Sequence, residues 1–180
     1  MYLRCLTLLS LLSALTACSS PAPTASPLQL TIDASAPTPC LADQSCAQAC
    51  ENANGQACFE SAMLQAQSSG ALFDPAKRSK LNEGREFPRA LELLKSECQS
   101  DNLISCYLAG QLCYMGLGGY LDQLCALSSF EKSCLGGVIQ GCTQLGKIYE
   151  SGRFVAPDGT KASRYLEAAC NAGDQSACRP

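Results

Sequence analysis

Apolar residues recur at helical spacing near the end of the chain. Intervals of three and four positions predict two consecutive amphipathic helices there. Their apolar positions are Leu145, Ile148 and Tyr149 in the first helix, then Ala162, Tyr165, Leu166, Ala169 and Cys170 in the second. The pattern therefore predicts an all-α structure built from pairs of helices.

The same pattern recurs when the sequence is shifted by 36 positions. The matched pairs are Gly110 with Gly146, Leu112 with Ile148, Gly116 with Gly152, Ala126 with Ala162, Phe130 with Leu166, and Gly137 with Gly173. A fixed period between about 20 and 50 residues is typical of solenoids, in which each repeat packs only on its neighbours.

Cysteines mark the same period. Four pairs are each separated by eight positions: Cys50 and Cys58, Cys98 and Cys106, Cys134 and Cys142, Cys170 and Cys178. The last three pairs begin 36 residues apart, and the first step is 48 residues, which indicates a 12-residue insertion. An even number of cysteines in an exported chain predicts a disulfide framework.

A disulfide across eight positions requires a turn between two helices. In one continuous helix these residues lie about 12 Å apart, whereas bridged Cα atoms need roughly 4.4–6.8 Å. Gly and Asn between the paired cysteines suit helix ends. Zinc sites use closer cysteine spacing, often with His, so we predict structural disulfides and neither a metal nor a cofactor.

The last repeat resembles a known repeat family. The residues that carry the likeness are Leu145, Gly146, Tyr149, Gly152, Asp158, Lys161, Ala162, Tyr165, Ala168, Ala169 and Gly173. They are similar to the Sel-one-like repeat, a relative of the tetratricopeptide repeat, and the cysteine pairs add a likeness to the Hcp-type cysteine-rich proteins. The match covers about residues 41–178, is looser in 106–134 and is weakest in 58–98.

This resemblance implies a right-handed α/α superhelix of about three disulfide-stapled helix-turn-helix repeats. In the middle repeat, Cys113 and Cys125 stand where the family pattern has Tyr149 and Lys161 in the last repeat. Because both positions change to Cys together, we infer that Cys113 and Cys125 pair. Cys40 and Cys46 are then left as a bridge near an N-terminal cap, although four cysteines allow three connectivities.

The insertion, at about residues 72–88, carries basic and acidic side chains together. They include Lys77, Arg78 and Lys80 beside Asp74, Glu83 and Glu86. A solvated surface excursion is the favoured interpretation, and a recognition loop is the alternative.

The first 17 residues have the layout of a secretory signal peptide. Arg4 precedes an apolar run that begins at Cys5 and has 13 residues when extended to Ala17, too few for a membrane span. Residues 15–18 resemble the bacterial lipobox, in which the cysteine, here Cys18, is lipidated. An ordinary cleavable signal with a chance cysteine is the alternative, and Ser19 after Cys18 is similar to lipoproteins sent to the outer membrane.

A linker follows the signal. Residues 18–39 hold five of the nine prolines among Ser, Thr and Ala. Such sequence favours extended polyproline II and spans roughly 60 Å at about 3.1 Å per residue. We therefore expect a signal peptide in 1–17, a lipidated tether in 18–39 and the repeat domain in 40–180.

Composition excludes several kinds of chemistry. The chain has 180 residues, a net charge of −3, 14 Cys, and neither His nor Trp. The lack of His removes Ser-His and Cys-His nucleophiles and His-ligated metals. The acidic balance argues against a nucleic-acid partner.

Two short strings are reminiscent of β-lactamases. Residues 129–132 fit S-x-x-K and residues 100–102 are S-D-N, but their order is reversed and K-T-G is absent. The Hcp-type resemblance separately implies penicillin binding and weak β-lactamase activity. We keep this as the alternative function.

The favoured function is a protein-interaction or assembly module in the cell envelope, exported to the periplasm, outer membrane or cell surface and touching the membrane through its lipid anchor alone. Solenoid repeats bind peptides or protein partners on the surface formed by their first helices. The candidate partner-binding residues are Tyr107, Gln111 and Tyr114 in one repeat and Thr143, Lys147 and Glu150 in the next. The two tyrosines could equally complete packing between repeats.

The last helix pair also carries an expectation. Terminal repeats need a cap over their apolar face. We expect the face near Tyr165, Leu166 and Ala169 to be partly open or covered by a partner or a second copy, with the tail after Cys170 folded back as a minimal cap.

Overall fold

The 36-residue period appears directly in the helices. The computed structural model describes residues 48–178, which are helical and contain no strand within that range. Helices α5 and α7 begin 36 positions apart, and so do α6 and α8. The elements are α2 (Gly55–Ser68), α3 (Pro75–Leu81), α4 (Glu86–Gln99), α5 (Leu103–Met115), α6 (Gln123–Leu135), α7 (Ile139–Ser151), α8 (Gly159–Asn171) and η1 (Gln175–Ala177).

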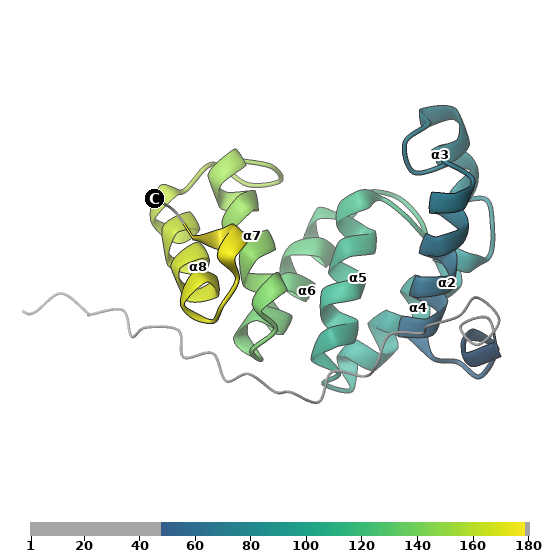
Figure 1. Ribbon diagram of the computed structural model, residues 1–180, viewed down its shortest axis with the longest axis horizontal. Coiled ribbons are helices and arrows are strands. Elements are labelled where there is room, and N and C mark those ends of the chain that lie inside the picture. The colour runs from purple at the N-terminus through teal and green to yellow at the C-terminus, as the bar shows by residue number, and fades with distance from the viewer. Residues whose placement is uncertain (1–47, 179–180) are drawn as a thin grey trace, which may run out of the picture.

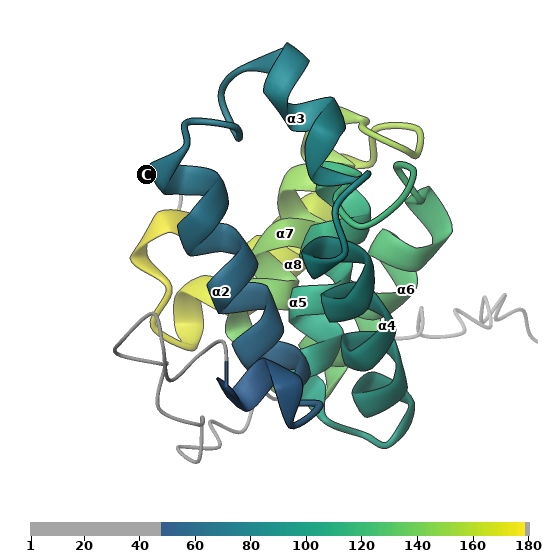
Figure 2. The same cartoon turned by 90° about the vertical axis from the view of Figure 1, so that its right-hand side faces the viewer.

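The helices stack in chain order. Helix α4 packs between α2 and α5, α6 packs between α5 and α7, and α8 packs on α7 and on η1 (Figure 1). Figure 2, seen from the α2 end, shows the successive pairs behind one another. Each of three repeats therefore has a first helix (α2, α5 or α7) and a second helix (α4, α6 or α8), and the predicted all-α solenoid is confirmed.

Polar side chains fix where these helices begin. Asn54, Asn102, Asp122 and Asp158 each accept a hydrogen bond from a backbone N–H in the first turn of α2, α5, α6 and α8. Such caps stabilise a helix by about 1 kcal/mol. Helices α5 and α7 end at Gly116 and Gly152, whose φ angles of 68° and 71° are left-handed.

Five disulfides join the described helices. Four span eight positions, with Cα–Cα distances of 4.5 to 4.8 Å, and link the second helix of one repeat to the next element or, for Cys50 and Cys58, the start of the fold to α2. The fifth joins Cys113 to Cys125 with a Cα–Cα distance of 5.9 Å. These are the pairs expected from the sequence, whereas the expected Cys40–Cys46 bridge, Cys18 and the signal and tether fall outside the described residues.

The second and third repeats each pack a glycine of the first helix against a large residue of the second. A Cβ atom at Gly110 would lie 2.8 Å from the ring of Phe130, and one at Gly146 would lie 2.5 Å from Leu166. Phe130 is completely buried and Leu166 nearly so. The glycines that the 36-residue shift aligns therefore let the two helices of a repeat approach closely.

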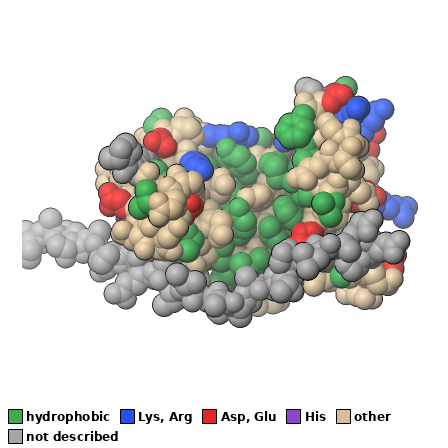
Figure 3. Space-filling view, in the orientation of Figure 1, with side chains coloured by type: hydrophobic (Ala, Val, Ile, Leu, Met, Phe, Trp, Pro, Cys, Tyr) green, Lys and Arg blue, Asp and Glu red, His purple; other side chains and the backbone are tan. Residues whose placement is uncertain are grey.

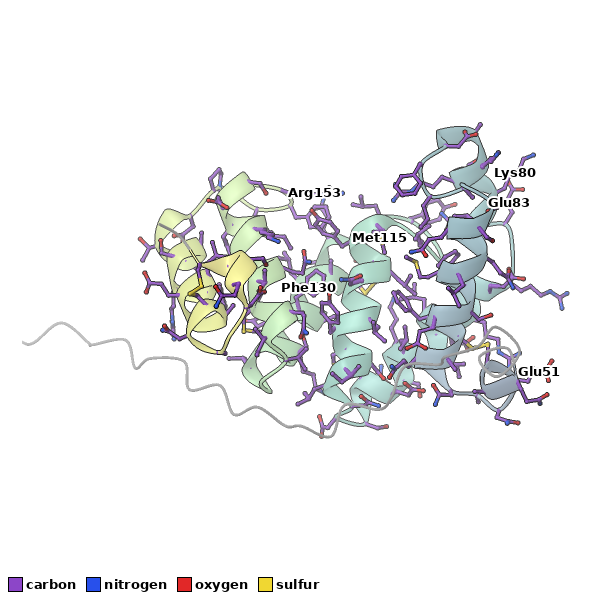
Figure 4. All side chains as sticks on the ribbon, in the orientation of Figure 1. Glu51, Lys80, Glu83, Met115, Phe130 and Arg153 are labelled. Carbon is purple, nitrogen blue, oxygen red and sulfur yellow. A yellow bond between two sulfur atoms is a disulfide. The ribbon has the colours of Figure 1, made fainter. Side chains whose placement is uncertain are left out.

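The insertion docks on the next repeat instead of forming only a solvated excursion. The Asn82 side chain donates to the carbonyl oxygens of Gly116 and Gly119 at 2.8 and 2.9 Å and accepts from the Gly118 N–H at 2.8 Å. Arg78 donates to the Met115 carbonyl oxygen at 2.7 Å. Lys80 and Glu83 do point away from the body of the protein (Figure 4). The expectation of a solvated excursion thus holds for the outer side of α3 and is wrong for Arg78 and Asn82.

The last helix pair has its own cap. Element η1 starts at the position where the period places another first helix, and Ala177 within it is buried against the same core cluster as Ala169 and Leu166. Tyr165 stays half-buried and stacks on Tyr149 with ring centroids 5.9 Å apart. The short tail therefore covers Leu166 and Ala169, as one of the expected arrangements has it.

Among residues 48–178, no helix combines the length and the apolar character needed to span a membrane.

Candidate interaction surface

Helix α5 buries one side and leaves an apolar second side half-exposed. Its buried positions are 105, 106, 109, 110, 112 and 113. Positions 104, 107, 108, 111 and 115 are half-buried, and their spacing places them on one stripe of the helix. Apolar residues predominate on that stripe, so α5 is apolar on more of its surface than its own repeat covers.

Helix α2 extends this surface. Phe59 and Met63 of α2 are half-buried and pack against the same core cluster as Leu108 and Met115 of α5. Figure 3 shows hydrophobic side chains gathered in a hollow over α5, between the α2 end and the α8 end of the molecule. We call Phe59, Met63, Tyr107, Leu108, Gln111 and Met115 the A-helix surface, because all lie on the first helix of a repeat.

Two of the candidate residues form a polar pair within this surface. The Gln111 amide donates to the Tyr107 hydroxyl, and the Tyr107 ring packs on Phe130 with centroids 6.1 Å apart. Burial raises the pKa of the Tyr107 phenol, the hydrogen bond from Gln111 opposes this effect, and the charge of Asp174 adds to it. The phenol is therefore neutral at physiological pH and keeps its proton, which can be donated to a partner.

Tyr114 completes packing between two repeats. The centroid of its ring lies 6.3 Å from that of Phe130 in its own repeat and 5.4 Å from that of Phe154 in the next repeat. The Arg153 guanidinium lies over the Tyr114 ring, 4.2 Å from its centroid, and donates to the Tyr114 carbonyl oxygen at 3.4 Å. Figure 4 shows Arg153 and Met115 at the same edge of the molecule. Packing between repeats is therefore shown for Tyr114, whereas the ring contact of Tyr107 with Phe130 lies within its own repeat, and both tyrosines are half-buried.

The candidates on α7 divide into buried and exposed residues. Thr143 is only 4% exposed, and its hydroxyl donates to the Asp174 carboxylate at 2.5 Å. Its prediction as a partner-binding residue is corrected, because the hydroxyl joins α7 to the turn before η1. Lys147 and Glu150 are exposed on α7. Hydrogen bonds from Thr143 and Ser176 hold the pKa of Asp174 below its ordinary value.

The two lactamase-like strings meet through an ion pair. Lys132 lies 2.7 Å from the Asp101 carboxylate and donates to the Cys98 carbonyl oxygen at 2.7 Å. This pairing lowers the pKa of Asp101. Within residues 48–178, no hydrogen bond joins Ser129 to Lys132, and the Ser129 hydroxyl lies 4.0 Å from the Cys125 sulfur. The lysine is thus engaged at the end of α4 and not with the serine that it would activate.

Sequence reasoning finds only Tyr107 and Gln111 of the six residues of the A-helix surface. It misses Phe59, Met63, Leu108 and Met115, because it considers positions not used by Leu or Gly on the last two first helices. Their half-buried state depends on how α2 and α5 sit against each other. The signal that could have found them is the apolar stripe of α5, which is wider than one neighbouring helix can cover.

Comparison with solved structures shows the fold. No model of a protein family matches the sequence. The structure is similar to a Sel1 repeat protein from Oxalobacter formigenes, with a TM-score of 0.51, 19% identity and coverage of 75% of this chain and 50% of that one. It is also similar to cysteine-rich protein B of Helicobacter pylori, with a TM-score of 0.53, 20% identity and coverage of 76% and 94%. A third similar structure is a protective antigen of uropathogenic Escherichia coli with this repeat fold. Its TM-score is 0.50 and its sequence identity 16%, and the match covers 77% of this chain and 35% of that one.

One curated protein is similar in sequence. The chain is 33% identical over 104 residues to cytochrome c oxidase assembly factor 7 of Xenopus tropicalis. The aligned region covers 54% of this chain and 45% of that protein. The chain thus matches less than half of the length of this relative. The structural comparisons show that the chain has the fold of a Sel1-type repeat solenoid.

Proposed function

We propose that this chain is an exported protein-interaction module that binds a peptide segment of its partner on the A-helix surface. The observation that carries the proposal is the apolar stripe of α5, which remains half-exposed although residues on both sides of it pack in the core. Contiguous apolar surface that is only partly covered is a common feature of binding sites for peptides and protein partners.

The chemistry of the surface defines the kind of segment. Phe59, Met63, Leu108 and Met115 offer large apolar side chains, and Met adapts to irregular shapes. The Tyr107 proton and the Gln111 amide supply polar contacts in the middle. An amphipathic segment with apolar anchors and a central hydrogen-bond acceptor fits this arrangement.

Export is supported by the disulfides. Five bridges in 131 described residues suit an oxidising compartment, because cytosolic thiols are kept reduced. With the signal layout before Cys18, we propose an outer-membrane lipoprotein whose tether holds the repeats away from the lipid. Palmitate labelling of the wild type and of Cys18→Ala tests this: label on the wild type alone supports the anchor, and an unlabelled wild type removes it.

An assembly role is one form of this function. The name of the Xenopus relative describes an assembly factor, and the shared 104 residues lie in a chain made of such repeats. We propose that the present chain likewise holds an envelope protein during or after its assembly.

Capture from envelope extract tests the interaction. The full chain and a Leu108→Ser/Met115→Ser variant are used as bait, with Leu135→Ser as the matched control because Leu135 is exposed on α6, outside the A-helix surface. A partner retained by the wild type and the control and lost by the α5 variant supports the proposal. A partner retained equally by all three, or none at all, contradicts it.

The alternative, a penicillin-binding protein with weak β-lactamase activity, rests on the two sequence strings, and the Asp101–Lys132 ion pair that joins them holds the lysine away from Ser129. Nitrocefin turnover decides between the functions. We expect no turnover, or turnover equal in the wild type, Ser129→Ala and the exposed neighbour Ser128→Ala. Turnover lost only in Ser129→Ala would favour the enzyme.

A further inference from the structure

The loop between α5 and α6 exposes more apolar surface than the equivalent loop of the next repeat. Tyr120 is 95% exposed, Leu124 80% and Leu121 45%. The positions 36 residues later, 156, 157 and 160, hold Ala, Pro and Thr and are also exposed. The repeat therefore needs no large apolar residue at these places for packing.

The insertion holds this loop in a fixed shape. Asn82 makes three hydrogen bonds with the backbone of residues 116–119. Gly118 has a φ of 84°, and a Cβ atom there would lie 2.6 Å from the Phe87 carbonyl oxygen. The exposed side chains are thus presented by a turn whose backbone is held in place, so little backbone conformational entropy is lost when they bind.

A pocket adjoins the exposed residues. Its volume is about 410 Å³, and its walls are Leu91 and Lys95 of α4 together with residues 118–124. Lys95 is exposed and makes no ion pair among the described residues, and the Asp122 carboxylate, which caps α6, lies on the same rim. Apolar projections, a hollow and charges of both signs therefore lie side by side.

We infer that this loop patch, made of Leu91, Lys95, Tyr120, Leu121, Asp122 and Leu124, joins two copies of the chain around a two-fold axis. In such an interface the same patch serves both partners, so each residue contact occurs twice. Tyr120 and Leu124 of each copy enter the pocket beside Leu91 of the other. Lys95 of each copy faces Asp122 of the other.

Self-complementarity favours a second copy over other occupants. A lipid surface would use the apolar projections and Lys95 but leave the pocket and the Asp122 carboxylate unmatched. In a second copy, the pocket accepts the exposed Tyr120 and Leu124 side chains, and the Lys95 ammonium pairs with the Asp122 carboxylate. The patch is confined to one loop and one helix face, which suits a weak dimer with a dissociation constant in the micromolar range.

Sedimentation equilibrium tests the inference. The full chain carrying Cys18→Ser, so that no acyl group is attached there, is compared from low to high micromolar concentration with Tyr120→Ser/Leu124→Ser. We expect a reversible dimer whose dissociation constant rises about tenfold or more in the double variant. Lys95→Glu should also weaken it, and more so at low salt, because two acidic residues then face each other.

Matched controls separate this surface from the others. Leu135→Ser removes a leucine that is 62% exposed on the same helix and should leave the dimer unchanged. Leu108→Ser/Met115→Ser should also leave it unchanged, so that failure here is distinct from failure of the A-helix surface. Far-UV circular dichroism verifies folding of each variant. Three results would overturn the inference. The chain could be a monomer at every concentration, or the dimer could be unchanged in both Tyr120→Ser/Leu124→Ser and Lys95→Glu. The third is a monomer that floats with lipid vesicles and loses this binding when the loop patch is changed.

Discussion

The second and third repeats join their helices at the same two positions by different chemistry. In the repeat of α5 and α6, Cys113 and Cys125 form a disulfide. In the repeat of α7 and α8, the Lys161 ammonium lies 5.0 Å from the centroid of the Tyr149 ring, at the positions 36 residues later. The architecture needs a contact at this place, and either a covalent bond or a cation over a ring supplies it.

A third position changes with the other two. Tyr165 stacks on Tyr149 in the third repeat, and the equivalent residue in the second is Ser129, whose hydroxyl lies 4.0 Å from the Cys125 sulfur. Position 113 holds a disulfide-bonded cysteine and no ring, so an aromatic residue at position 129 would have no ring on which to stack. The serine of the S-x-x-K string therefore lies beside the disulfide as a packing residue.

Removal of the disulfide should produce the largest effect. Closing a 12-position loop restricts the unfolded chain, and the chain-entropy relation gives about 3 kcal/mol for Cys113→Ser/Cys125→Ser. Urea unfolding followed by circular dichroism measures this loss. An unchanged unfolding midpoint would show that packing alone holds α5 on α6, and Ser128→Ala serves as a silent control on the exposed side of α6.

The second largest effect is expected from replacing the glycines at which the two helices of a repeat approach closely. Gly110→Ala places a methyl group against the Phe130 ring, which cannot change shape, whereas Gly146→Ala meets Leu166, which can change rotamer. We expect Gly110→Ala to cost about 1–3 kcal/mol of stability, and Gly146→Ala to cost less. Thermal unfolding of both variants measures the order, and the reverse order would contradict the packing described for these two helix pairs.

Much of this architecture follows from the sequence, because a period repeats its information. The helix pairs, their glycines and the four bridges across eight positions recur along the chain, so each copy supports the others, whereas Cys113–Cys125 is inferred from two positions that change together. Contacts made once carry no such signal. The docking of Asn82 on residues 116–119 and the Thr143–Asp174 hydrogen bond depend on where nonequivalent segments meet in space.

Removal of the cation in the third repeat should have a small effect. Lys161 is more than half exposed, and a cation over a ring at such a site contributes about 0.5–1 kcal/mol. Lys161→Met keeps the aliphatic chain and loses the charge, including its 4.0 Å contact with the partly exposed Asp158 carboxylate, so the free energy of unfolding should fall by about this amount. If Lys161→Met lost as much unfolding free energy as Cys113→Ser/Cys125→Ser, the two contacts would be equally strong. That result would contradict the expected difference between the two repeats.

The smallest expected effect is a change in how the stability of the protein depends on acidic pH when Asp174 is replaced. The pKa of Asp174 is held below its ordinary value in the fold, so its contribution is full above the ordinary pKa of about 3.9 and disappears as the pH falls through the folded value. Asp174→Asn should therefore flatten the fall in stability below about pH 4. Asn102, the amide cap of α5, provides the contrast: Asn102→Ala should lower stability equally across this range. A pH profile unchanged in Asp174→Asn would contradict the assignment.

The order of the cysteines has a consequence for how the protein is made. Each of the five described bridges joins two cysteines with no other cysteine between them in the sequence. In the export that we propose, the chain leaves a translocon N-terminus first and can be oxidised pair by pair, since a loop of about ten residues closes within about 100 ns once both thiols are free. An oxidase that links each new thiol to the preceding one produces the native set without reshuffling by an isomerase.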